Sequence, residues 1–109
     1  GSTVSPMIPI ERLRVAERAH LFALEVYPIA AKWPDRILSA QLRRAVLSIP
    51  SNIVEGAGRE SKTEFARFVG ISYASAAEVR YQLRFAKELG LLAEADAARL
   101  EDELNQIRR

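Results

Sequence analysis

The chain has 109 residues, of which 49% are hydrophobic and 28% charged, which is the balance of one small globular domain. It contains no cysteine, so disulfides and cysteine-based metal sites are excluded, and a reducing, cytoplasmic location is expected. The formal net charge is only +2, yet 13 of the 16 basic residues are Arg. The guanidinium group suits phosphate, although genomic base composition also favours Arg over Lys.

Residues 1–9 are predicted to be a flexible lead-in, because they include Ser5, Pro6 and Pro9. Gly1 and Ser2 look like the remnant of a tag and are left out of the fold prediction. Residues 10–109 are predicted to form a single domain. No stretch approaches the ~18 apolar residues of a membrane span.

Residues 10–32 form the first predicted helix, and they carry two apolar stripes that lie almost opposite each other at about 100° per residue. Pro28 is expected to kink this helix or end it early. The stripe predicted to face the core is Leu13, Ala16, His20, Leu24, Tyr27 and Ala31. The second stripe is Val15, Ala19, Phe22, Val26, Ile29 and Trp33.

Residues 36–55 form the second predicted helix, which Asp35 can cap after the break at Pro34. Its apolar spacing continues in phase past Pro50, which predicts one kinked helix and not two. The residues 56–58, Gly-Ala-Gly, then predict a left-handed C-terminal cap. The core face is Leu38, Leu42, Ala45, Val46, Ile49 and Ile53.

Ser61 and Glu64 match the capping box and start a third predicted helix over residues 62–89, which Gly90 ends. The fourth predicted helix covers residues 93–109 and has a narrow apolar stripe, as expected of an outer helix. The main face of the third helix is Phe65, Phe68, Val69, Ser72, Ala76, Val79, Leu83, Ala86 and Leu89. The stripe of the fourth is Ala97, Leu100, Leu104 and Ile107.

Four helices with short connections predict an all-α, antiparallel up-and-down four-helix bundle. The first and third helices each have a second apolar face, which a single chain would expose and which therefore predicts a homo-oligomer. Alternatively, the first helix buries both of its stripes within one chain. The predicted oligomer interface is Val15, Phe22, Val26, Trp33, Ile71, Tyr81 and Phe85.

A basic sector is the best candidate for function. Arg80, Arg84 and Lys87 follow i, i+4, i+7 spacing, Lys62 shares their side of the helix, and such an edge can contact phosphates of RNA. The alternative is a solvated face with ion pairs of the Arg84–Glu88 type. The predicted nucleic-acid-binding residues are Arg36, Arg43, Lys62, Arg80, Arg84 and Lys87.

Catalysis has little support in the sequence, and we expect no enzyme activity, no cofactor and no metal site. His20 is the only histidine and is predicted to be a hydrogen-bonded core residue. Residues 48–55 gather polar side chains around Pro50. They can form a ligand site, but hydrogen bonds to backbone groups, or pairs of Glu55 with Arg59 or Arg44, are favoured.

The run of residues 48–56, SIPSNIVEG, followed by Gly58, Arg59 and Ser61, resembles the signature of a known family. These are the four-helix-bundle proteins encoded by intervening sequences in large-subunit ribosomal RNA genes. Supporting stretches are residues 41–45 (QLRRA), 64–68 (EFARF) and 82–83 (QL) with 86–90 (AKELG), and the similarity covers roughly residues 12–107.

The resemblance implies an up-and-down bundle that assembles into ring-like homopentamers. A related branch accompanies the reverse transcriptases of diversity-generating retroelements, where a basic pentamer engages RNA or the polymerase. Two functions are therefore expected: a non-catalytic homopentamer that binds RNA through repeated basic stripes, or a protein-interaction scaffold such as an accessory subunit of a reverse transcriptase.

Overall fold

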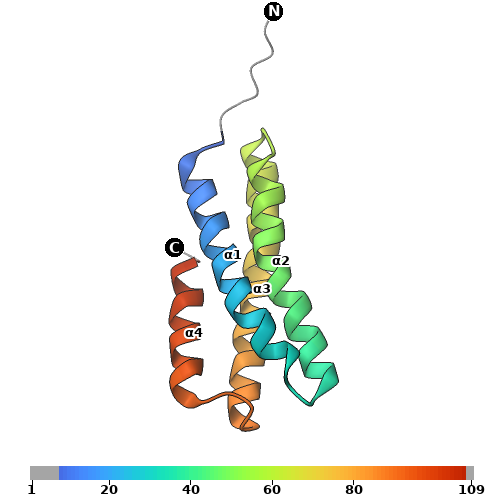
Figure 1. Cartoon of the computed structure of the whole chain (residues 1–109). Helices are drawn as coiled ribbons and strands as arrows, with labels where there is room; N and C mark the ends of the chain where they lie inside the picture. Colours follow the sequence, from blue (N-terminus) through green and yellow to red (C-terminus); the bar gives the residue numbers. More distant parts are fainter. Residues whose placement is uncertain (1–7, 108–109) are drawn as a thin grey trace, which may run out of the picture.

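The computed structural model describes residues 8–107 and contains four α-helices (Figure 1). They are α1 (Ile10–Ala31), α2 (Arg36–Ala57), α3 (Lys62–Glu88) and α4 (Glu94–Ile107). The predicted all-α four-helix bundle is confirmed, and the bounds of α1, α2 and α3 and the start of α4 lie within two residues of those predicted. The predicted end of the fourth helix, at residue 109, lies outside the described residues. Most of the predicted lead-in, residues 1–7, lies outside the described residues.

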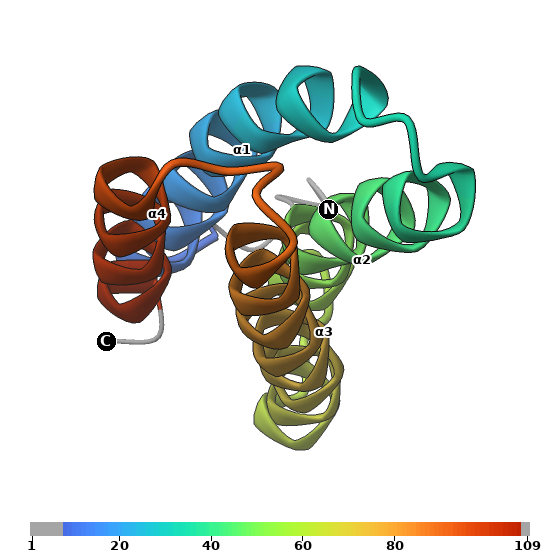
Figure 2. The ribbon, with the colours of Figure 1, turned by 90° about the horizontal axis from the view of Figure 1, so that it is seen from below.

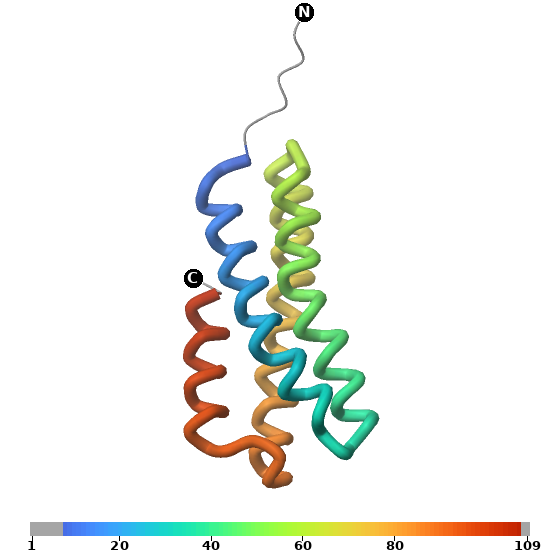
Figure 3. The backbone as a smooth tube through the Cα atoms, viewed as in Figure 1, coloured from blue at the N-terminus to red at the C-terminus, as the bar shows by residue number. Residues whose placement is uncertain are grey.

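Successive helices run in opposite directions and occupy the four corners of the bundle (Figure 2). The α2 helix packs closely against α1 on one side and α3 on the other, and α4 closes the ring between α3 and α1. Because α4 has 14 residues against 22 to 27 in the other helices, it covers only part of the bundle's length (Figure 3).

Two ion pairs join α4 to α1. Arg18 Nε lies 3.0 Å from Glu103 Oε1, and Arg99 pairs with Glu25 about two turns further along α1. The hydrogen bond and the charge of Glu25 raise the pKa of Arg99 above its ordinary value. Both pairs are solvent-exposed, so they orient α4 more than they stabilise it.

The helix caps read from the sequence are present, with one exception. Asp35 accepts hydrogen bonds from the amides of Ile37 and Leu38 (3.1 and 3.0 Å), and Gly90 has a φ of 81° after the end of α3. The predicted left-handed cap after α2 is wrong, because Gly58 has a φ of −81° in the right-handed region. The helix continues to Ala57 instead.

Gly56 is buried inside α2, where it allows α3 to approach closely. A Cβ atom at this position would lie 2.8 Å from Cβ of Phe68 and 3.3 Å from Cδ1 of Phe65. These distances leave no room for a methyl group, so the glycine serves helix–helix contact and not a turn. Close packing of α2 against α3 thus explains why the 48–56 run ends in glycine.

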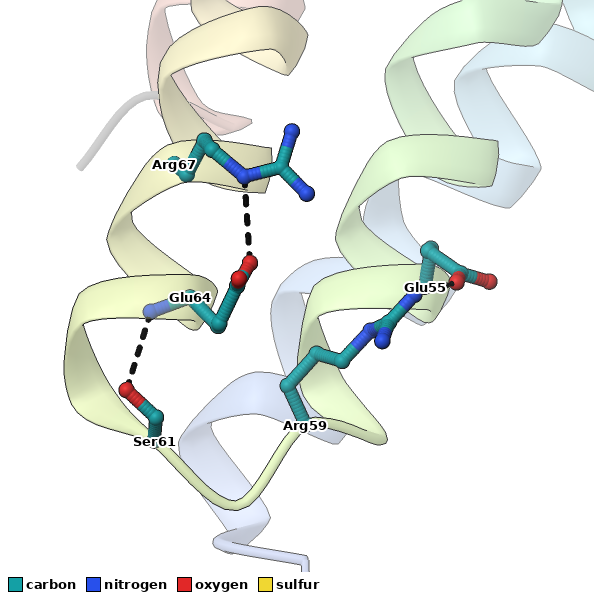
Figure 4. A network of polar contacts seen from close by, with 5 residues as sticks. All are labelled: Glu55, Arg59, Ser61, Glu64 and Arg67. Atoms are coloured by element: carbon teal, nitrogen blue, oxygen red, sulfur yellow. Dashed lines mark hydrogen bonds and ion pairs between the residues drawn. The ribbon is translucent and has the colours of Figure 1, made fainter.

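The turn between α2 and α3 is held by a polar network (Figure 4). Glu55 pairs with Arg59, the Ser61 hydroxyl accepts the Glu64 amide at 3.2 Å, and Glu64 pairs with Arg67 at 3.0 Å. The guanidinium groups of both arginines lie over the ring of Phe68, 5.1 and 4.4 Å from its centre. Cation–π contacts of this kind fix the turn against the end of the core.

Both internal prolines lie within continuous helices. The α1 helix passes Pro28 and ends at Ala31, and α2 passes Pro50, so α2 is one helix as predicted. Near Pro50, Asn52 Nδ2 donates to the Ser48 carbonyl at 2.8 Å. Polar side chains of residues 48–55 thus bond to backbone groups and neighbouring helices, as the structural interpretation of this run predicts.

The face of α1 that points into the bundle is the reverse of the predicted one. Leu13 and Leu24 are 49% and 58% exposed, and His20 is exposed, so the prediction of a core histidine is wrong. The stripe that includes Phe22 and Val26 fills the core instead. It is flanked by small buried residues that let neighbouring helices approach closely, namely Ala19, Ala23 and Ala30.

Candidate functional site

The structure brings three of the six predicted nucleic-acid-binding residues together. Arg80, Arg84 and Lys87 line a shallow groove between α3 and α4 near the lower end of the bundle. Their i, i+4, i+7 spacing places them on the edge of α3 that faces α4, so the predicted stripe exists as a continuous edge.

The charges along this groove are partly neutralised. Arg80 is half-buried and donates to the Asn105 side chain of α4, while its Nε is buried with no hydrogen-bond partner among residues 8–107. Arg84 Nε lies 2.8 Å from Glu88 Oε2. Glu94 and Glu101 of α4 line the same groove. Arg80 therefore helps to attach α4. Arg84 is exposed, and half-buried Lys87 makes no ion pair among the described residues, so these two cations remain for a polyanion.

The other three predicted binding residues lie elsewhere. Lys62 begins α3, about 37 Å along the helix from Lys87 at 1.5 Å per residue. Arg36 donates to carbonyl oxygens at the end of α1, including that of Trp33 at 3.2 Å. Arg43 donates to Ser39 and lies against the ring of Tyr27 on α1. Arg36 and Arg43 make contacts within the chain, so the six residues do not form one patch.

The predicted interface residues of α1 are mostly internal. Phe22, Val26 and Trp33 are buried within the single chain and Val15 is half-buried, so the expectation that this stripe is exposed is wrong. Two opposite apolar stripes have the same period, and periodicity alone cannot say which one meets the core. The alanines beside Phe22 and Val26 were the available signal, because close-packed helices favour small residues at their contact.

Two predicted interface residues of α3 form the centre of an apolar patch. Tyr81 and Phe85 are 60% and 44% exposed, and their ring centroids are 6.2 Å apart. Exposed Leu89 follows on the same helix. All three residues line one shallow hollow on the surface of α3. We call Tyr81, Phe85 and Leu89 the α3 patch.

Ile71 of α3 is also exposed, as predicted for an interface residue, but it lies nearer the middle of the helix than the α3 patch.

A second apolar surface lies on the outer sides of α1 and α2, where the sequence prediction placed core. Leu13 and Leu24 of α1 are exposed, as are Leu47 and Val54 of α2. The contact of Arg43 with Tyr27 sets the register of these helices, and it places Leu24 at the level of Leu47. We call Leu13, Leu24, Leu47 and Val54 the α1–α2 surface.

The described residues offer neither a metal site nor a membrane-spanning helix. Among residues 8–107, no three His, Asp or Glu side chains gather in a way that could hold a metal ion. None of the described helices has the length and apolar character to cross a membrane.

Fold and surface together define a small up-and-down four-helix bundle with exposed apolar surfaces and a basic edge on α3. A family model described as 23S rRNA-intervening sequence protein matches residues 11–109, and the chain belongs to that family. A search of curated proteins finds no match.

A solved structure from Bacteroides thetaiotaomicron VPI-5482, described as a protein with unknown function from the S23 ribosomal protein family, has the same fold. It superposes with a TM-score of 0.78 at 20% sequence identity. The match covers 86% of this chain and 91% of that one.

Proposed function

We propose that this protein is a non-catalytic homo-oligomer of the cytoplasm that binds RNA through basic edges repeated on its subunits. The observation that carries the proposal is the exposed apolar area on α1, α2 and α3, which remains although the core of the single chain is filled. Single exposed apolar residues are common, but neighbouring ones at helical spacing are typical of interfaces.

The two apolar surfaces differ in composition and position, which favours contact between unlike surfaces of neighbouring subunits. The α1–α2 surface is aliphatic, whereas the α3 patch is centred on Tyr81 and Phe85. A contact of one surface with the other repeats from subunit to subunit, and it forms a closed ring when the rotation between neighbours is a whole fraction of a turn. A pentamer is the subunit number that the family resemblance implies.

In this proposal each subunit carries one weak RNA-binding site, and RNA binding depends on several copies of that site in the assembly. Arg84 and Lys87 supply two cations on each subunit, and Glu94 and Glu101 oppose them in the same groove. A single edge is therefore expected to bind weakly, but several edges held in one assembly act together on one polyanion. The family description places such proteins in the context of 23S rRNA, which supports RNA as the polyanion.

Mass photometry and a salt series test the proposal. We expect a single species larger than a monomer, and an affinity for structured RNA that falls steeply as salt rises from about 50 to 200 mM. A protein that stays monomeric at micromolar concentration contradicts the assembly. Affinity that does not change with salt contradicts binding through Arg84 and Lys87.

A protein-interaction scaffold, such as an accessory subunit of a reverse transcriptase, is the second candidate. The mixed charge of the α3–α4 groove favours it, because Glu94 and Glu101 repel phosphate but can pair with basic residues of a protein. Co-purification of a polymerase that survives nuclease treatment and high salt would support this function over RNA binding.

A further inference from the structure

A second groove lies beyond the described end of α4. The α4 helix lies between α1 and α3, with its apolar stripe buried, and its last described residue, Ile107, lies at the end of this groove. Beyond Ile107, α1 and α3 continue towards the α2–α3 turn, and no helix of residues 8–107 covers the space between them (Figure 3). The groove thus continues the position that α4 occupies lower down.

The floor of this groove is apolar. It has a volume of about 450 Å³ and is lined by side chains of α1, α2, α3 and α4. Ile53 and Ile107 are buried at its base, while Val15, Phe65 and Val69 are half-buried along its sides. A volume of this size accepts the apolar side chains of about two helical turns.

The rim of the groove is mainly basic. Arg12, Arg14 and Arg18 line it, with Glu11 as the acid among the lining residues. The Arg12 guanidinium lies 3.9 Å above the ring of Phe65 and is fixed there. Arg14 is exposed and makes no hydrogen bond or ion pair with any residue between 8 and 107. An acidic group can therefore pair with Arg14 without displacing another partner.

The packing of α4 shows which occupant fits. Glu103 on the flank of α4 pairs with Arg18 of α1, and Arg14 lies one turn away on the same edge of α1. A helix that continues in the direction of α4 would place an acid beside Arg14 in the same way. Its apolar stripe would cover Val15 and Val69 as the stripe of α4 covers the lower core.

We infer that this groove is a docking site for an amphipathic helix of a partner protein, with apolar residues at i, i+4 and i+7 and acidic residues on one flank. Among the four helices of residues 8–107, another copy of this chain does not offer such a helix. Its most acidic helix is α4, whose apolar residues Leu100 and Leu104 are already fully buried. The inference is independent of RNA binding through the α3–α4 groove.

Two designed peptides of about 16 residues test the site. Both carry the same leucine stripe, and one has Glu while the other has Lys on its flank. We expect the acidic peptide to bind and to shift the methyl NMR signals of Val15, Val69 and Ile107. Arg14→Glu should weaken its binding at least about tenfold, because attraction becomes repulsion. Arg44→Glu, at an exposed arginine of α2 without an ion pair in the described region, should change nothing.

Several outcomes would overturn the inference. Equal binding of the Lys-flanked peptide would show that charge does not select the partner. Shifts confined to the methyl groups of Leu89 would place the peptide on the α3 patch instead. Absence of any binding by the acidic peptide would exclude the groove as a docking site for such a helix.

Discussion

Ser72 of α3 donates its hydroxyl to the carbonyl oxygen of Ile49 on α2, at 2.9 Å, immediately before Pro50. Both residues are almost completely buried. Pro50 has no amide hydrogen, so α2 lacks one backbone hydrogen bond at this point. The Ser72 hydroxyl does not replace that bond, but it joins α3 to α2 one residue before the proline.

Ser72→Ala should lower the free energy of unfolding by about 1–2 kcal/mol, because it removes a buried donor to the Ile49 carbonyl. Urea unfolding followed by circular dichroism measures the change. Ser51→Ala is the matched control, since Ser51 is an exposed serine of α2 two residues from Ile49, and its effect should stay within about 0.5 kcal/mol. Equal stability of the two variants would show that the contact contributes nothing.

Gly56→Ala should destabilise the protein by about 1–3 kcal/mol, although alanine is the better helix former. The added methyl group would meet Cβ of Phe68 at 2.8 Å and push α2 and α3 apart. Gly70→Ala makes the same change in α3 with no atom within 4 Å, and it should stabilise the protein by about 0.5–1 kcal/mol. Thermal unfolding of both variants measures the two changes in stability. If both substitutions stabilise the protein, or both destabilise it, the packing explanation is wrong.

The double variant Leu13→Glu and Leu24→Glu should reduce the oligomer to a folded monomer, because it places charges on the proposed α1–α2 interface. Light scattering gives the mass, and circular dichroism shows whether the helices persist. Phe22→Glu should instead unfold the chain, since Phe22 is 2% exposed. An unchanged mass for the double variant would exclude this face from the assembly.

The double variant Arg84→Glu and Lys87→Glu should weaken RNA binding at least about tenfold and reduce its dependence on salt. The two side chains lie together on the α3–α4 groove, whereas Lys62 lies at the opposite end of α3. Lys62→Glu is therefore the control and should have a much smaller effect. Filter binding across a salt series measures both, and equal losses would indicate a general charge effect and not a site.

Much of the bundle could be predicted from residues that act locally. The side chains of Asp35 and Ser61 accept hydrogen bonds from free amides at the start of a helix, and Gly90 follows the end of α3 in a left-handed conformation. The sequence alone therefore locates these boundaries. The spacing of Arg80, Arg84 and Lys87 likewise requires only helical geometry to place them on one edge.

Only the tertiary structure decided which side of α1 is inside. Leu24 and Phe22 belong to stripes of equal period on opposite sides of the helix, and hydrophobicity favours burial of either one. The choice depends on how closely other helices can approach, which the alanines beside Phe22 permit. For the same reason, the sequence could not reveal Glu94 and Glu101 opposite the basic edge, or the groove that α4 leaves open. Both depend on contacts between segments far apart in the chain.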